Sequence, residues 1–110
     1  MSIKIGEFEE LVLISVQRLG DNAYGVPIRR YLEEAGRDVS IGALYVTLER
    51  LQEKGLVTSK AGGATAERGG RAKRYYQLTG EAVASLEEAE AIRMRVRIGN
   101  VGVALQPRLA

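Results

Sequence analysis

The residues with the clearest chemical potential are four closely spaced basic side chains. Arg68, Arg71, Lys73 and Arg74 stand beside a single acid, Glu67, and between them lie two glycines. Guanidinium and ammonium groups at this density can bind phosphate oxygens, and arginine also favours narrow minor grooves. An isolated run of this kind can equally be a solvated loop, so its meaning depends on the elements that position it.

The basic residues follow a segment typical of a helix, residues 40–54. Ser40 is a good N-cap, and Gly55 ends the apolar spacing. The three- and four-residue spacing predicts one narrow buried stripe, formed by Ile41, Leu44, Leu48 and Leu51. Tyr45 could be a further core residue or could contact a phosphate or sugar. Gly42 and Ala43, near the start of the helix, permit close approach to the phosphate backbone or bases. The rotation of the helix decides which of the further candidates Thr47, Glu49 and Arg50 point outward.

The rest of the chain predicts the elements that hold this segment. Two helices are expected over residues 7–19 and 24–35, and two antiparallel strands over residues 56–60 and 72–78. Thr79 is a good N-cap for a last helix ending near residue 98, in which acids come first and arginines last, as the helix dipole favours. Its apolar stripe is thin, so it suits a partner helix better than a second core.

This order of elements predicts a winged helix-turn-helix, a mainly α fold with a small β-hairpin (α+β) and a C-terminal dimerisation helix. We expect residues 1–78 to form the DNA-binding domain, 79–99 the dimerisation helix and 100–110 a poorly ordered tail. The third helix would enter the major groove, and the wing would lie on the minor groove or backbone. The residues predicted to bind DNA are Ser40, Gly42, Ala43, Tyr45, Val46, Glu49, Arg50, Arg68, Arg71, Lys73 and Arg74.

Composition argues against several other classes of protein. The chain has no cysteine and no histidine, so disulfides, the usual zinc sites and the commonest general base are missing. We therefore expect no enzymatic activity, no cofactor and no metal. The net charge is only +2, so attraction to nucleic acid must come from local clustering. No segment approaches the roughly 20 apolar residues of a membrane span, and we expect a soluble cytoplasmic protein with no membrane partner.

Five stretches resemble the PadR family of bacterial transcriptional regulators. They are FEELVL (8–13), AYGVPI (23–28), IGALY (41–45), LERLQEKGLV (48–57) and RGGRAKRYYQLT (68–79), and the likeness covers about residues 6–88. The resemblance implies a homodimeric repressor with an N-terminal winged helix and a C-terminal dimerisation helix. It also implies a response to phenolic acids, drugs or other small hydrophobic effectors. Many members carry proline where this chain has Val46, which would slightly alter the recognition helix.

The combined interpretation is a repressor that binds a palindromic operator as a homodimer, with its two recognition helices about 34 Å apart. Two alternatives stay open from the residues alone. The winged helix could serve protein–protein contacts within a larger assembly, in which case the wing arginines would be dispensable. The chain could instead be a small-molecule-binding protein whose DNA affinity is incidental, in which case it would show no operator preference.

Overall fold

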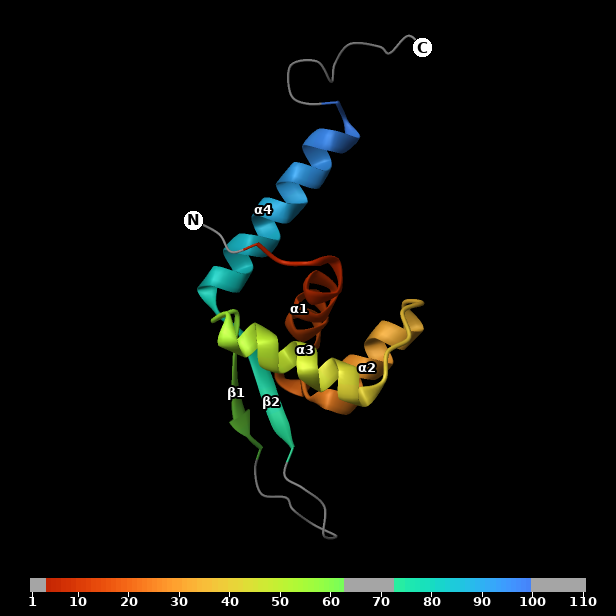
Figure 1. The fold of residues 1–110 in the computed structure, drawn as a ribbon, viewed down its shortest axis with the longest axis vertical. Helices are drawn as coiled ribbons and strands as arrows, with labels where there is room; N and C mark the ends of the chain where they lie inside the picture. Colours follow the sequence, from red (N-terminus) through yellow and green to blue (C-terminus); the bar gives the residue numbers. More distant parts are fainter. Residues whose placement is uncertain (1–3, 63–72, 100–110) are drawn as a thin grey trace.

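The computed structural model describes residues 4–62 and 73–99, which form four helices, a short 3-10 turn and one hairpin (Figure 1). The elements are α1 (Glu7–Leu19), η1 (Gly20–Asn22), α2 (Gly25–Glu34), α3 (Ile41–Glu53), β1 (Val57–Ala61), β2 (Arg74–Leu78) and α4 (Gly80–Arg97). Their order and type confirm the predicted α+β winged-helix fold. The predicted second helix is one residue shorter at each end, because Tyr24 and Ala35 are its caps.

The core is centred on α1, against which α2, α3 and the hairpin pack. Val12 and Leu13 are fully buried and Val16 nearly so, which explains why this helix is apolar on more than one face. Leu44, Leu48 and Leu51 of α3 are fully buried as predicted. Ile41 is not part of this stripe, since it is 38% exposed at the first position of α3. That prediction was wrong because the helix end projects beyond the core.

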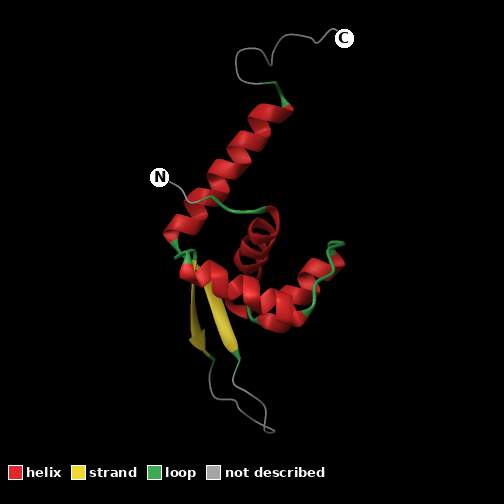
Figure 2. Cartoon of the chain, in the orientation of Figure 1, coloured by secondary structure: helices red, strands yellow, loops and turns green. Residues whose placement is uncertain are grey.

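The hairpin is a two-stranded antiparallel sheet whose register pairs Val57 with Leu78 and Ala61 with Arg74 (Figure 2). A backbone hydrogen bond from Tyr76 N to Ala23 O, 2.9 Å long, attaches β2 to the segment before α2. The predicted return strand began at residue 72, whereas β2 begins at Arg74. The glycine-rich tip with Arg68 and Arg71 lies outside the described residues.

The last helix, α4, starts against the core and then leaves it (Figure 1). The Thr79 side chain caps it by accepting from Ala82 N at 3.2 Å, and its hydroxyl donates to Gly55 O at 2.8 Å. Only Ala82, Ser85 and Leu86 of this helix are buried. In residues 4–62 and 73–99, no helix combines the length and the apolar character needed to cross a membrane. The predicted tail, 100–110, lies outside the described residues.

Candidate nucleic-acid interface

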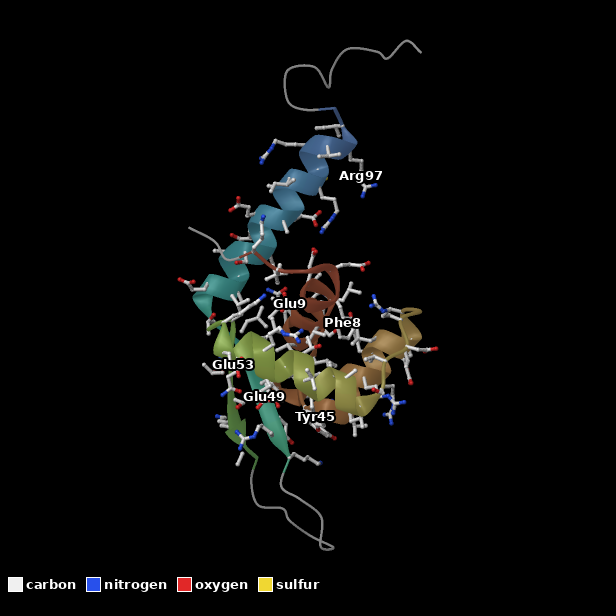
Figure 3. All side chains as sticks on the ribbon, viewed as in Figure 1. Phe8, Glu9, Tyr45, Glu49, Glu53 and Arg97 are labelled. Atoms are coloured by element: carbon white, nitrogen blue, oxygen red, sulfur yellow. The ribbon has the colours of Figure 1, made fainter. Side chains whose placement is uncertain are left out.

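One face of α3 is buried and the opposite face is open to solvent. The open face carries every α3 residue predicted to contact DNA: Gly42, Ala43, Tyr45, Val46, Glu49 and Arg50. Tyr45 is 44% exposed and Val46 55% exposed, so the core reading of Tyr45 is wrong. Thr47, considered as a further outward candidate, is only 6% exposed and lies on the core side. Figure 3 labels Tyr45, Glu49 and Glu53 along this helix.

The N-terminus of α3 is capped as predicted. The Ser40 hydroxyl accepts a hydrogen bond from Ala43 N at 3.1 Å, which satisfies one of the free N–H groups of the first turn. A Cβ added at Gly42 would meet nothing within 4 Å. The first turn of α3 therefore has open space beside it, which leaves room for a backbone or base to approach.

The ring of Tyr45 packs closely on the first residue of α2. A Cβ added at Gly25 would collide with the Tyr45 hydroxyl and would stand 2.8 Å from its Cζ atom. Only glycine therefore fits at position 25 while the ring keeps this position. This close approach fixes the side chain of Tyr45 on the open face of α3 and ties α3 to the start of α2.

A polar groove of about 570 Å³ separates α3 from the hairpin. Within it the Arg74 guanidinium donates to Ser59 Oγ at 3.1 Å, and Ser59 Oγ donates to Gln52 Oε1 at 3.0 Å. Glu49 and Glu53 line the same groove. Arg74 is thus held beside α3 by a hydrogen-bonded chain in a groove that also contains negative charge.

Tyr76 forms the floor of this groove and stays a neutral phenol. Burial raises the pKa of its hydroxyl above the usual range. Tyr45 and Glu49 add to the rise, while the positive charge of Arg74 opposes it. The hydroxyl remains protonated and can donate or accept a hydrogen bond there.

The other described basic residue that the hairpin region contributes to the predicted interface is Lys73, directly before β2. Its ammonium lies 4.6 Å from the centre of the Tyr24 ring, and Lys73 itself is exposed. The structure thus brings Lys73 and Arg74 to the end of the hairpin from which residues 63–72 extend. It does not describe Arg68 or Arg71, whose predicted roles stay predictions.

Three residues around this surface were missed from the sequence: Tyr24, Gln52 and Ser59. Gln52 and Ser59 are ordinary polar residues, and their link to Arg74 spans 22 positions of the chain. No local sequence pattern predicts hydrogen bonds between residues this far apart in the chain. Tyr24 did carry a signal, since an aromatic residue directly before a glycine and a helix start is unusual for an N-cap.

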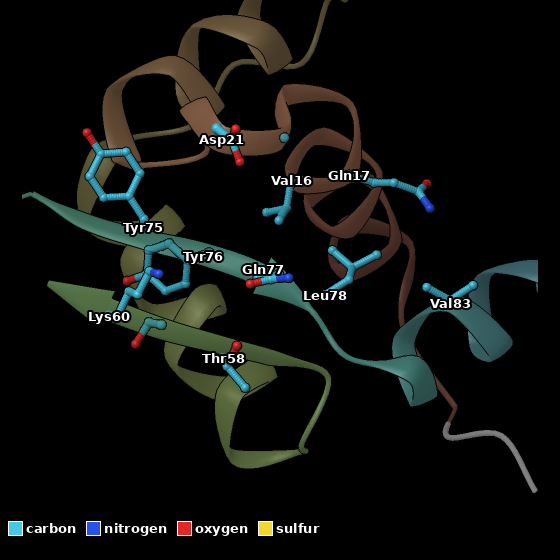
Figure 4. A pocket seen from close by; sticks show the side chains of 12 residues that line it. Val16, Gln17, Asp21, Thr58, Lys60, Tyr75, Tyr76, Gln77, Leu78 and Val83 are labelled. Atoms are coloured by element: carbon cyan, nitrogen blue, oxygen red, sulfur yellow. The ribbon is translucent and has the colours of Figure 1, made fainter. Parts of the chain in front are cut away.

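A second groove, of about 430 Å³, lies between the end of α1 and the hairpin (Figure 4). The apolar side chains of Val16, Leu78 and Val83 gather toward one end of it. None of the residues predicted to bind DNA lines this groove. It shares Ser59 and Tyr76 with the polar groove beside α3.

Comparison with known proteins agrees with the fold. Residues 12–88 match the profile of the family described as "Transcriptional regulator PadR-like family". A PadR-like transcription factor from Bacteroides fragilis is 29% identical, with a TM-score of 0.71 and 82% of each chain covered. A PadR family transcriptional regulator from Eggerthella lenta is 26% identical, with a TM-score of 0.65, covering 89% of this chain and 82% of that one. No curated protein sequence matches the chain.

Proposed function

The chain belongs to the PadR-like family of transcriptional regulators, and we propose that it represses transcription as a homodimer bound to a palindromic operator. The observation that carries the proposal is the open face of α3 beside a hairpin with basic residues at its end. A DNA-binding regulator needs one helix that buries one face and presents the other to the duplex. In this chain α3 buries one face in the core and exposes the opposite face.

In the proposed complex α3 lies in the major groove, which is about 12 Å wide and admits one helix. Gly42 and Ala43 allow close approach at its first turn, and Ser40 lies where a phosphate would pass. Tyr45 and Val46 offer apolar contacts, for example with a thymine methyl group. Glu49 can accept from cytosine N4 and Arg50 can donate to guanine, which are the pairings that specify sequence.

The wing, defined as the hairpin β1–β2 with the residues that join its strands, supplies the backbone contacts. Lys73 and Arg74 lie at its described end, and Arg68 and Arg71 belong to the sequence that joins the two strands. We propose that these cations meet the minor groove or the phosphates beside it. Such contacts position the regulator and make its affinity depend on salt.

We assign dimerisation to residues 79–99, which contain α4, and DNA binding to residues 1–78. Beyond the core, α4 exposes three large apolar side chains, Ile92, Met94 and Val96, and its C-cap residue Ile98 is exposed as well. A second copy of the chain would cover them. Two copies of α3 would then reach successive major grooves about 34 Å apart, which is the geometry of a palindromic site.

A small hydrophobic effector has a candidate site on the same helix. A groove of about 550 Å³ runs between α4 and the segment before α1, with Ile5, Ala89, Ile92 and Val96 among its apolar lining. We propose that the chain works in the cytoplasm, where its DNA lies. A shift of the thermal midpoint with a panel of small aromatic compounds, absent in an Ile5→Ser variant that leaves the proposed dimer face of α4 unchanged, would support this site.

The deciding experiment is operator selection from a pool of random duplexes, followed by fluorescence anisotropy at several salt concentrations. The proposal expects an enriched inverted repeat and a linear fall of log affinity with log salt. An Arg50→Ala variant should relax the preference at one position of each half-site, by about 10-fold or more in discrimination. Absence of any enriched sequence, or salt-independent binding, would contradict the proposal and favour a protein-contact module.

A further inference from the structure

Lys73 does not extend freely from the hairpin but lies on an aromatic pair. Its ammonium is 4.6 Å from the centre of the Tyr24 ring. The Tyr24 ring in turn contacts Tyr75, with 5.2 Å between ring centres and a tilt of 56°. Both tyrosines are half-buried, whereas Lys73 is exposed. The charge thus lies at the surface over the Tyr24 ring, and that ring is in turn supported by Tyr75 from a different part of the chain.

The backbone keeps these two rings together. Tyr76 N donates to Ala23 O at 2.9 Å, so the residues adjacent to Tyr75 and Tyr24 are joined directly. On the other side of Tyr75, a Cβ added at Gly62 would collide with its ring. The ring therefore lies close against the end of β1. In Figure 4 the Tyr75 ring rises from β2 on the side of Asp21, the side on which η1 leads toward Tyr24.

This arrangement is continuous with the open face of α3. Tyr24 directly precedes Gly25, on which the ring of Tyr45 packs. The surface thus runs from Tyr45 across the start of α2 to Lys73. Lys73 adds an exposed ammonium to that surface, and its three N–H donors can still bind an acceptor while the charge lies over the Tyr24 ring.

We propose that Tyr24 and Tyr75 are positioning residues for DNA binding, which hold the Lys73 ammonium in place for one phosphate of the duplex. A free lysine loses much rotamer freedom when it binds a phosphate. A lysine already placed over a ring has lost part of that freedom before DNA arrives, and the cation–π attraction persists in the complex. The inference rests on the proposed docking of α3 and the wing on DNA.

The test is a double-mutant cycle on the duplex selected by the wild-type protein, read by anisotropy across a range of potassium chloride concentrations. Lys73→Met should lower the slope of log affinity against log salt by about 1. Tyr24→Leu should weaken binding about two- to fivefold, whereas Tyr24→Phe, which keeps the ring, should bind like wild type. Tyr31→Leu, at another partly exposed tyrosine of α2, is the matched control and should change nothing.

The cycle separates positioning from a merely structural role. In the Lys73→Met background, Tyr24→Leu should have no further effect on affinity. An equal loss in both backgrounds would show that Tyr24 acts through the fold, and an unchanged salt slope in Lys73→Met would show that the ammonium meets no phosphate. Either result overturns the inference while leaving the regulator itself intact. If the wild-type protein selects no duplex, the proposed function fails instead.

Discussion

The carboxylate of Glu9, in the first turn of α1, accepts two hydrogen bonds from the ammonium of Lys54 at the end of α3, at 2.8 and 2.9 Å. It also accepts from Gly6 N at 2.8 Å, so the same side chain caps α1. Glu9 is only 8% exposed. One buried acid therefore joins the beginning of the central helix to the end of the helix proposed to read DNA.

The pair predicts a loss of stability in acid. Burial raises the pKa of Glu9, but the hydrogen bonds from Lys54 and Gly6 and the charges of Lys54 and Arg50 lower it by more, so the net pKa is lowered. The contribution to the free energy of unfolding is then complete above the ordinary carboxyl pKa and is lost as pH falls through the lowered pKa of Glu9. Thermal midpoints of wild type and Glu9→Gln from neutral to acidic pH should converge in that range.

At neutral pH, Glu9→Gln should cost about 1–2 kcal/mol, discounted because the Lys54 side chain is about a third exposed. The exposed pair Arg29–Glu33, with an N–O distance of 3.4 Å, supplies the matched control. Glu33→Gln should change stability by less than about 0.5 kcal/mol. Equal effects of the two substitutions in urea unfolding would show that burial does not strengthen the Glu9 pair.

The close approach of Tyr45 to Gly25 predicts a compensating pair of substitutions. Gly25→Ala should destabilise the fold by about 1–3 kcal/mol, because the new methyl group overlaps the ring. Gly80→Ala, also at the first position of a helix but with open space around it, should be neutral or slightly stabilising. Adding Tyr45→Ala should recover most of the loss caused by Gly25→Ala. A double variant no more stable than Gly25→Ala alone would argue against the overlap.

Dimerisation through α4 predicts that charge on its apolar face separates the subunits. Ile92→Glu together with Val96→Glu should give a monomer in sedimentation, with the circular dichroism of the folded chain retained. Ala84→Glu, an exposed position nearer the start of α4, serves as the control and should stay dimeric. A dimer that survives the double substitution would place the interface on another surface.

The chain from Arg74 through Ser59 to Gln52 predicts an effect on DNA affinity with little effect on stability. Ser59→Ala removes the atom that both accepts from Arg74 and donates to Gln52, so the guanidinium should lose its fixed place beside α3. We expect affinity for the selected duplex to fall about threefold, in the range of one modest hydrogen bond. Thr58→Ala, one position earlier on the strand, should bind as wild type does.

The helices could be predicted from the sequence because the spacing of apolar residues and the capping residues are local features. The bounds of α1 were predicted to the residue, and both Ser40 and Thr79 cap as expected. Contacts between residues far apart in the sequence could not be predicted. The partner of Glu9 lies 45 positions away, and the helix rotation that buries Thr47 depends on how α3 packs on α1 and α2.

The same reasoning applies to the candidate interface. The residue types of Tyr45, Glu49 and Arg50 made them candidates, but the sequence left their direction to the rotation of the helix. The structure shows that all three are exposed. The contacts that support this surface could not be predicted from the sequence. Gly25 and Tyr24 act through close packing, which leaves no periodic pattern in the sequence. Tertiary packing also decides that Ile41 stays outside the core.

The close packing of Tyr45 on Gly25 constrains the order in which these two positions can change during evolution. After gene duplication, a copy could replace Tyr45 on the proposed DNA-binding face with a smaller residue while glycine stays at position 25. The reverse order is less favourable, because a side chain at position 25 meets the tyrosine hydroxyl and the ring must move to make room. Change at position 45 should therefore precede change at the buried glycine more often than follow it.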